Sequence, residues 1–107
     1  MDSIENKLSD QSEKELYRRT DEVLHYMWDP IGVSNIPEVR DEYYGYLPQV
    51  FMLLKENQDK SKIEAFLNQV ETELIGLPAD TVRNNMISET LINWKDYIIE
   101  KNKNKVQ

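Results

Sequence analysis

Apolar side chains recur at helical spacing along most of this chain, and no segment alternates with the period of two that a half-buried strand requires. Four segments carry such a stripe. Such stripes joined by short links predict an all-α fold, a small single-domain antiparallel bundle of about four helices over residues 1–107, with loose polar ends at 1–10 and 102–107. The stripe residues are Leu16, Thr20, Val23 and Met27; Tyr43, Leu47, Val50 and Leu54; Ile63, Leu67, Val70 and Leu74; and Ile87, Leu91, Trp94 and Ile98.

Start and stop signals bound these segments. Ser-x-x-Glu capping boxes at residues 12–15 and 61–64 predict helix N-termini, because each side chain can satisfy an unpaired backbone N–H of the first turn. The Asp-Pro pair at 29–30 predicts the end of the first helix, since the residue before a proline avoids the helical conformation. Gly76 followed by Pro78 predicts the end of the third helix, with Gly76 left-handed.

The second segment contains a proline inside its stripe. Pro48 predicts either a kink or a split into helices over 38–46 and 48–56, because proline lacks the N–H that a helix interior uses. A polar turn is predicted at 57–60, and the last helix is predicted to open at residue 80 or 81.

Charge and composition exclude several function classes. The formal net charge is −7, from 13 Lys and Arg against 20 Asp and Glu, which disfavours direct nucleic-acid binding and favours a basic protein partner. No cysteine is present, so neither a disulfide nor a thiolate metal site can form. No apolar run reaches the roughly 18 residues of a membrane span, and residues 1–10 lack a secretory signal. A cytoplasmic protein without a membrane association is expected.

The negative charge is concentrated in the middle of the chain. Residues 21–80 hold twelve acids and four bases, a charge of −8, whereas residues 1–20 carry −1 and residues 81–107 carry +2. The stretch 26–46 within this region also holds four of the six tyrosines and one of the two tryptophans. Tyrosines bury large rigid surfaces at protein interfaces, and carboxylates steer a cationic partner.

Two aromatic residues of this stretch, Trp28 and Tyr43, fall on the apolar stripes and are expected in the core. Tyr44 lies off the stripe and is the better candidate for a surface aromatic.

Catalytic signals are weak. His25 is the only histidine, with Asp21, Glu22 and Asp29 one turn away; a catalytic or metal-binding role is an alternative to the simpler prediction, a partly exposed helix residue beside solvated acids. Adjacent carboxylates such as 41–42 point about 100° apart on a helix and do not share a site. Without a glycine-rich loop, metal-ligand spacing or nucleophile elbow, the prediction is a protein that is not an enzyme, with no cofactor and no metal.

One group of motifs is similar to a family of small helical bacterial proteins, over roughly residues 21–77. Some members accompany contact-dependent growth inhibition loci, where they are immunity proteins that bind and neutralise a toxin, often a nuclease. At position 44 this chain departs from the family pattern, which favours a small acidic or polar residue. The matching elements are Trp28-Asp29-Pro30-Ile31-Gly32-Val33, Asp41-Glu42-Tyr43 with Tyr46, Leu47-Pro48-Gln49-Val50, and Gly76-Leu77.

The shared motif is interpreted as scaffold. Asp29 is expected to hydrogen-bond amides of the following turn, Asp41 to cap or brace the link over 30–37, and Tyr43 to fill the gap between helices.

The resemblance and the charge pattern together imply an immunity protein that neutralises a cognate basic toxin domain. The alternative is a cytosolic protein-binding adaptor unrelated to toxins. A homodimer is a further possibility, formed through the spare apolar residues Ile31, Ile36, Ile92 and Ile99. The predicted toxin-binding residues are Asp21, Glu22, Glu38, Asp41, Glu42 and Tyr44.

Overall fold

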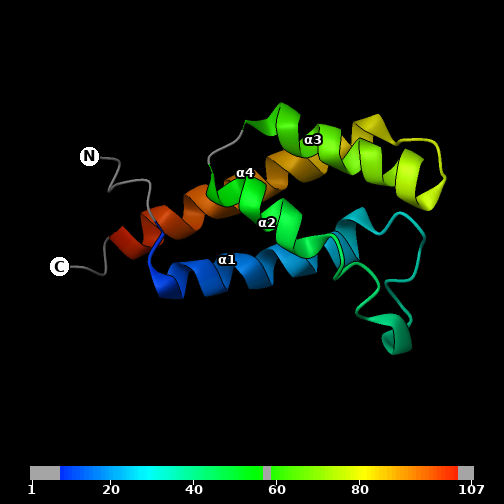
Figure 1. Ribbon diagram of the computed structural model, residues 1–107. Coiled ribbons are helices and arrows are strands. Elements are labelled where there is room, and N and C mark those ends of the chain that lie inside the picture. Colours follow the sequence, from blue (N-terminus) through cyan, green and yellow to red (C-terminus); the bar gives the residue numbers. More distant parts are fainter. Residues whose placement is uncertain (1–7, 57–58, 104–107) are drawn as a thin grey trace.

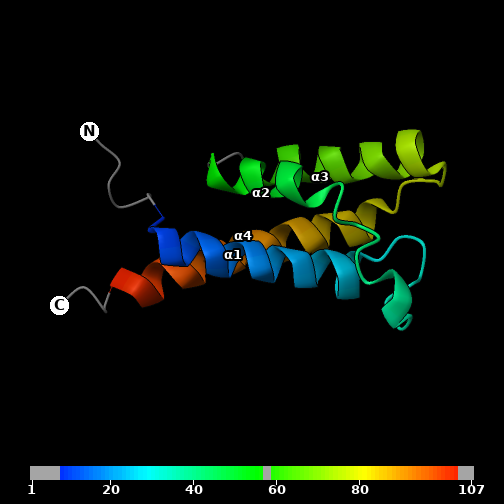
Figure 2. The ribbon, with the colours of Figure 1, turned by 60° about the horizontal axis from the view of Figure 1, so that its bottom comes forward.

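Four α-helices pack antiparallel in two layers, with α2 and α3 lying over α1 and α4 (Figures 1 and 2). The computed structural model describes residues 8–56 and 59–103, and no strand occurs among them. The longest helix, α4, packs against each of the other three. The predicted all-α bundle of four helices is therefore confirmed. The helices are α1 (Asp10–Glu22), α2 (Leu47–Lys55), α3 (Lys60–Gln69) and α4 (Thr81–Lys103).

The core lies between the two layers and takes side chains from all four helices and from the link between α1 and α2. Burial of each large apolar side chain contributes about 1.5–3 kcal/mol to the free energy of folding. Most of the predicted stripe residues are buried here. The core side chains are Leu8, Leu16, Val23, Leu24, Trp28, Tyr43, Leu47, Val50, Leu54, Ile63, Leu67, Val70, Ile87, Leu91 and Ile98.

Two helices begin earlier than predicted, so both predicted capping boxes are wrong. Ser9 is the N-cap of α1, and its Oγ accepts a hydrogen bond from the Ser12 amide at 3.1 Å. Asp59, two residues before Ser61, is the N-cap of α3 and accepts from the Lys62 amide at 3.3 Å. In each case a favoured N-cap residue lies upstream of the predicted one, and its side chain accepts a hydrogen bond from an otherwise unpaired backbone amide.

The segment before α2 is not an α-helix, so the predicted helix over 38–46 is wrong. Pro37–Val39 forms one turn of 3₁₀ helix, and hydrogen bonds spanning three residues continue as far as the Tyr46 amide, which donates to the Tyr43 carbonyl at 3.0 Å. Pro48 lies in the first turn of α2, where its missing N–H costs nothing. The proline therefore starts a helix here and does not kink one.

Helices α1 and α3 each continue into a π-helical turn, over Val23–Trp28 and Val70–Ile75. A π turn accommodates one more residue than an α turn, so it shifts by one position which side chains face the core. Met27 and Leu74, which the stripes predict to be buried, are exposed as a result. Trp28 is buried in the first of these turns and Glu71 in the second.

The predicted stops of these two segments are confirmed. Asp29 ends the first with a left-handed backbone at φ 38°, and Gly76 ends the second at φ 87°. The start of α4 also agrees with the prediction, because the Asp80 carboxylate accepts from the Arg83 amide at 3.0 Å ahead of the helix. Of the polar turn predicted at 57–60, residues 57–58 lie outside the described residues.

The ordered chain extends further than predicted at both ends. Leu8 is buried in the core, and α4 includes Asn102, whose Nδ2 donates to the Ser12 hydroxyl. The outermost residues of the predicted loose ends, 1–10 and 102–107, lie outside the described residues. Among the helices of the described residues, none is both long and apolar enough to span a bilayer.

The left-handed end of the second π turn makes a testable contribution to stability. An alanine Cβ at Gly76 would meet no atom within 4 Å, so Gly76→Ala tests the backbone conformation alone. We expect it to lower the free energy of unfolding by about 1 kcal/mol in urea denaturation. Gly45 is equally open but has no left-handed φ, so Gly45→Ala is the control and should be neutral or slightly stabilising. Equal effects of the two substitutions would contradict this account.

Candidate functional site

Asp29 organises the link that follows the first π turn. Its Oδ1 accepts hydrogen bonds from the Val33 amide at 2.8 Å and from the Tyr43 hydroxyl at 2.7 Å, and its Oδ2 accepts from the Ser34 amide at 3.1 Å. The Tyr43 hydroxyl in turn accepts from the Ile31 amide at 3.2 Å. The expectation that Asp29 binds turn amides is confirmed, and Tyr43 fixes the link to the core.

The charge of Asp29 is part of this arrangement. Burial raises the pKa of the Asp29 carboxyl, but the hydrogen bonds from Tyr43, Val33 and Ser34 outweigh burial, and the pKa lies below its ordinary value. Burial also raises the pKa of the Tyr43 hydroxyl, which therefore remains a donor at neutral pH. The ionised carboxylate thus anchors the link between α1 and α2.

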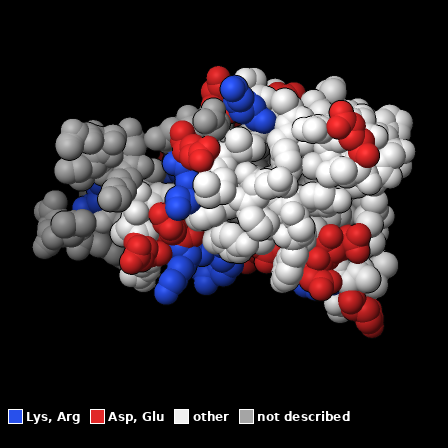
Figure 3. All heavy atoms as spheres, viewed as in Figure 1, with Lys and Arg blue, Asp and Glu red and all other residues white. Residues whose placement is uncertain are grey.

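Four of the six predicted binding residues share the short segment that Asp29 and Tyr43 hold in place. Glu38, Asp41, Glu42 and Tyr44 are all exposed, Tyr44 by 49%. We call these four residues the acidic surface. In Figure 3 acidic atoms gather at the lower right, over the segment that joins α1 to α2. The expected bracing role of Asp41 is wrong, because its side chain forms no hydrogen bond with any described residue and points to solvent.

Asp21 is brought next to this surface but is already paired. Arg40 binds Asp21 with two hydrogen bonds of 3.0 and 3.1 Å, and its guanidinium lies 5.3 Å from the centre of the Tyr26 ring. The hydrogen bonds to Asp21 raise the pKa of Arg40 above its ordinary value despite burial. Arg40 is the only base between residues 29 and 46. Its charge is therefore neutralised by Asp21 and not by the acidic surface.

Glu22 is not brought together with the other predicted residues. Its carboxylate pairs with Arg19 at 2.8 Å, and Arg19 lies over the Trp94 ring of α4, 4.8 Å from the ring centre. The side chain of Glu22 is thus engaged on the seam between α1 and α4.

Three of the four tyrosines in the 26–46 stretch pack against other side chains of the bundle, and the fourth does not. Tyr43 is buried, Tyr46 packs edge-on against Trp28 with ring centres 6.1 Å apart, and Tyr26 lies under Arg40. Tyr44 makes no ring contact with the described residues. It is the free aromatic side chain of the acidic surface, as its place off the stripe predicts.

The predicted exposure of His25 is wrong. The imidazole is 2% exposed because the π turn rotates it inward, where it packs against Tyr26 and Tyr43 with ring centres 4.5 and 6.4 Å away. Its Nδ1 has no hydrogen-bond partner. Within the described residues no group of three or more His, Cys, Asp or Glu residues could hold a metal ion.

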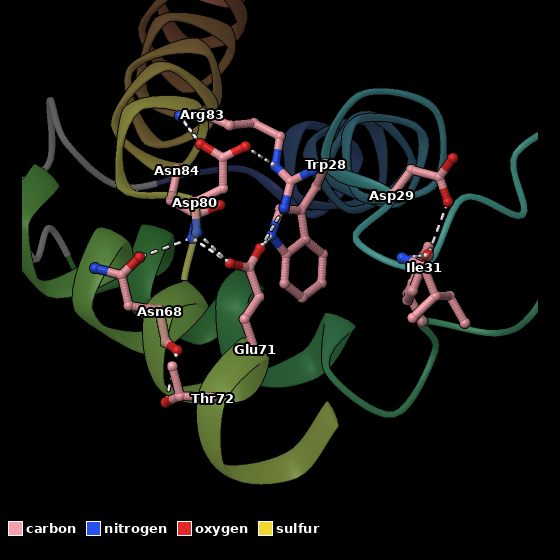
Figure 4. A network of polar contacts seen from close by, with 10 residues as sticks. Trp28, Asp29, Ile31, Asn68, Glu71, Thr72, Asp80, Arg83 and Asn84 are labelled. Carbon is pink, nitrogen blue, oxygen red and sulfur yellow. Dashed lines mark hydrogen bonds and ion pairs between the residues drawn. The ribbon is translucent and has the colours of Figure 1, made fainter. Parts of the chain in front are cut away.

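Sequence reasoning missed the carboxylate that supports this region from inside. Glu71 is fully buried, and its Oε2 accepts from the Trp28 indole N–H at 2.7 Å and from Arg83 Nη2 at 2.6 Å. Its Oε1 accepts from the Asp80 amide at 2.8 Å and from Asn84 Nδ2 at 3.1 Å (Figure 4). One side chain thereby joins both π turns to the start of α4.

The network positions the site without forming part of its surface. Trp28 packs against Tyr43 and Tyr46, with ring centres 5.5 and 6.1 Å away. The hydrogen bond to Glu71 therefore fixes the Trp28 ring, and with it the two tyrosines that lie beside the acidic surface in the chain. The one signal in the sequence is Trp28 itself, because a buried indole N–H needs an acceptor. The identity of that acceptor depends on the π turn, which the apolar pattern does not reveal.

Comparison with family models, with curated proteins and with solved structures finds no match for this chain. The expected similarity to growth-inhibition immunity proteins, drawn from the residue pattern at 28–33, 41–43, 46–50 and 76–77, therefore stays a prediction. The structure adds that two residues of the pattern, Asp41 and Glu42, are exposed and belong to the acidic surface.

Asp29 should make stability depend on pH. Asp29→Asn keeps an acceptor and tolerates the left-handed backbone but removes the charge, so we expect a loss of about 1 kcal/mol at pH 7. Because the folded pKa lies below the reference value of 3.8, the wild-type advantage is complete above about pH 5 and is lost as the pH falls through the folded pKa.

Urea unfolding of both proteins at pH 7 and near pH 3 measures this change. Asp41→Asn, at an exposed carboxylate without a hydrogen bond, is the control and should have almost no effect. An Asp29→Asn deficit of the same size at both pH values would show that the charge is not its cause.

Glu71 should be among the most sensitive positions of the chain. Glu71→Ala leaves an arginine and three other donors without their acceptor and should cost about 3–5 kcal/mol. Trp28→Phe removes one of these donors and some volume and should cost about 2 kcal/mol. Glu73→Ala, at an exposed acid of the same π turn, is the control, with a change within about 0.5 kcal/mol. Chemical denaturation measures all three, and a Glu71→Ala effect no larger than that of Glu73→Ala would refute the role of the network.

Proposed function

We propose that this chain is a non-enzymatic inhibitor of the immunity-protein class, which binds the basic toxin domain of a contact-dependent growth inhibition system through its acidic surface. The observation that carries the proposal is the pairing of Arg40 with Asp21. This ion pair neutralises Arg40, the one base of the segment. Glu38, Asp41 and Glu42 are therefore without a cationic partner in the described residues. These three carboxylates are free to receive cations of another protein.

The chemistry of the surface suits a nuclease partner. A nuclease needs basic side chains to hold phosphates, so carboxylates presented on a rigid segment can occupy the same groups. Tyr44 supplies a large side chain with few rotamers, which loses little entropy when a partner covers it. Such a protein blocks the substrate groove of the toxin or a site beside it. The resemblance at residues 28–33 and 41–50 supports this class over an adaptor unrelated to toxins.

Rescue and capture test the class. The proposal expects a toxin gene beside the gene of this chain; co-expression with that toxin domain should restore growth, and the two proteins should purify together. His25→Ala should preserve rescue wherever the variant remains folded, because the proposal gives this residue no chemical role. Absence of both rescue and co-purification would exclude the immunity function.

Binding kinetics test the surface. The triple variant Glu38→Gln, Asp41→Asn, Glu42→Gln should slow association with the toxin domain by about 10-fold or more at low salt, because it removes steering charges. Raising salt from about 50 to 500 mM should slow the wild type and leave the variant almost unchanged. Tyr44→Ala should mainly speed dissociation, by about 10-fold or more.

The chain offers a control with the same change of net charge. Glu89, Asp96 and Glu100 are exposed acids of α4, so Glu89→Gln, Asp96→Asn, Glu100→Gln alters charge away from the acidic surface. If this triple slows association as much as the first one, general charge and not the acidic surface determines the rate.

A further inference from the structure

The segment that carries the acidic surface is attached to α1 through Arg40, in addition to the contacts of Tyr43. Arg40 lies between Glu38 and Asp41 in the chain. Its Nη1 donates to Asp21 Oδ1 at 3.0 Å, and its Nη2 donates to Asp21 Oδ2 at 3.1 Å. These bonds join residues that are 19 positions apart. They hold the middle of the segment against α1.

The geometry of this ion pair fixes both the orientation and the position of Arg40. Two parallel N–H···O bonds define the plane of a guanidinium, which the single ammonium group of a lysine does not do. The guanidinium also lies 5.3 Å from the centre of the Tyr26 ring, a second contact with the same end of the first helix. The side chains of Arg40 and Asp21 are 32% and 21% exposed, so the pair is partly shielded from water.

The backbone of the segment does not fix its position by itself. Its hydrogen bonds join residues three apart, as in the bonds from the Glu42 amide to the Val39 carbonyl at 3.0 Å and from the Tyr44 amide to the Asp41 carbonyl at 3.1 Å. Such bonds shape a turn without tying it to a neighbouring element. In the described part of the chain, the polar side-chain contacts between residues 37–46 and the remainder of the bundle are those of Arg40 and Tyr43.

The three unpaired carboxylates of the acidic surface are close neighbours of Arg40 in the chain. Glu38 lies two residues before it, Asp41 follows it directly, and Glu42 lies two residues after it. Their positions relative to the bundle therefore depend on where Arg40 is held. A surface that is ordered before binding loses less conformational entropy when a partner covers it.

We propose that Asp21 and Arg40 are positioning residues of the toxin contact: their ion pair holds Glu38, Asp41 and Glu42 in place, and neither charge of the pair is used to bind the toxin. This inference rests on the proposed function. It gives Asp21, which the sequence predicts to bind the toxin, a different role in the same contact.

The two roles of Asp21 predict opposite effects of removing Arg40. If Asp21 bound the toxin directly, loss of Arg40 would release its carboxylate and tighten the complex. If the pair positions the segment, the same loss loosens the segment and weakens the complex. The comparison belongs at about 500 mM salt, where screening suppresses the change in steering that follows from altered net charge.

A double-mutant cycle on the dissociation constant of the complex with the toxin domain tests the proposal. Asp21→Asn and Arg40→Gln should each raise this constant by about 5-fold, the effect of losing one well-oriented ion pair. The double variant should be no weaker than either single variant, because either change already removes the pair. Arg40→Lys keeps the charge without the two parallel bonds and should recover only part of the loss.

The chain offers a matched control in the ion pair between Glu15 and Lys101. This pair also joins α1 to a distant part of the chain, at 2.7 Å, and its side chains are 17% and 33% exposed. Glu15→Gln therefore removes an acid of α1 with similar exposure but away from the acidic surface. It should change the dissociation constant by less than about 2-fold. Equal effects of Glu15→Gln and Asp21→Asn would assign the loss to general destabilisation and overturn the proposal.

Amide hydrogen exchange of the chain alone separates this inference from the proposed function. The Glu42 and Tyr44 amides should exchange about 5-fold faster in Asp21→Asn than in the wild type, and at an unchanged rate in Glu15→Gln. A wild type that fails to bind the toxin domain overturns the proposed function and the inference with it. Normal wild-type binding combined with unchanged exchange in Asp21→Asn, or with tighter binding by Arg40→Gln, overturns the inference alone.

Discussion

The buried Glu71 carboxylate is the interaction on which the loop end of this bundle depends. It accepts hydrogen bonds from Trp28, Arg83, Asn84 and the Asp80 amide, and so joins the ends of α1 and α3 to the start of α4. A buried carboxylate is tolerated only when donors and a counter-charge surround it. The position of each donor is therefore fixed by its hydrogen bond to the carboxylate. The position of Trp28, and of the tyrosines that pack on it, follows from this requirement.

The two π turns explain both what the sequence predicts and what it does not. The helical stripes identify four helices and most of the core, because their spacing reports the α-helical period directly. An inserted residue changes the register from the turn in which it occurs onward, and each π turn lies at the end of its helix. Met27 and Leu74, each the last member of its stripe, are accordingly the positions predicted to be buried that are exposed. No local preference in the sequence marks the insertion, since the bond between Trp28 and Glu71 that accompanies it joins residues far apart in the chain.

The sequence predicts the features of the acidic surface that depend on composition, but it does not predict which of the nearby acids form ion pairs with which bases. The concentration of acids and tyrosines in the middle of the chain identifies the segment, and the place of Tyr44 off the stripe identifies its exposed aromatic side chain. The sequence treats Asp21 and Glu22 as equivalent acids, yet they are bound to different arginines, Arg40 and Arg19. The Arg19–Glu22 pair is local, three residues apart on α1, but Arg40 meets Asp21 only through the path of the link, which is fixed by Asp29 and Tyr43. Long-range pairs of this kind have no signature in the spacing of residues.

Two arginines at the loop end of the bundle are paired with carboxylates distant from them in the chain. Arg40 is the only base between residues 29 and 46, and Arg83 is the only base between residues 74 and 86. Arg40 is bound by Asp21, and Arg83 is bound by the buried Glu71 and lies 3.9 Å from the exposed Asp80 beside it. Pairing with Asp21 leaves the acidic surface with its full negative charge, whereas pairing with Glu71 supplies the counter-charge that a buried carboxylate requires. The first pair thus leaves the acidic surface open to a cationic protein, and the second stabilises the end of the bundle from which that surface extends.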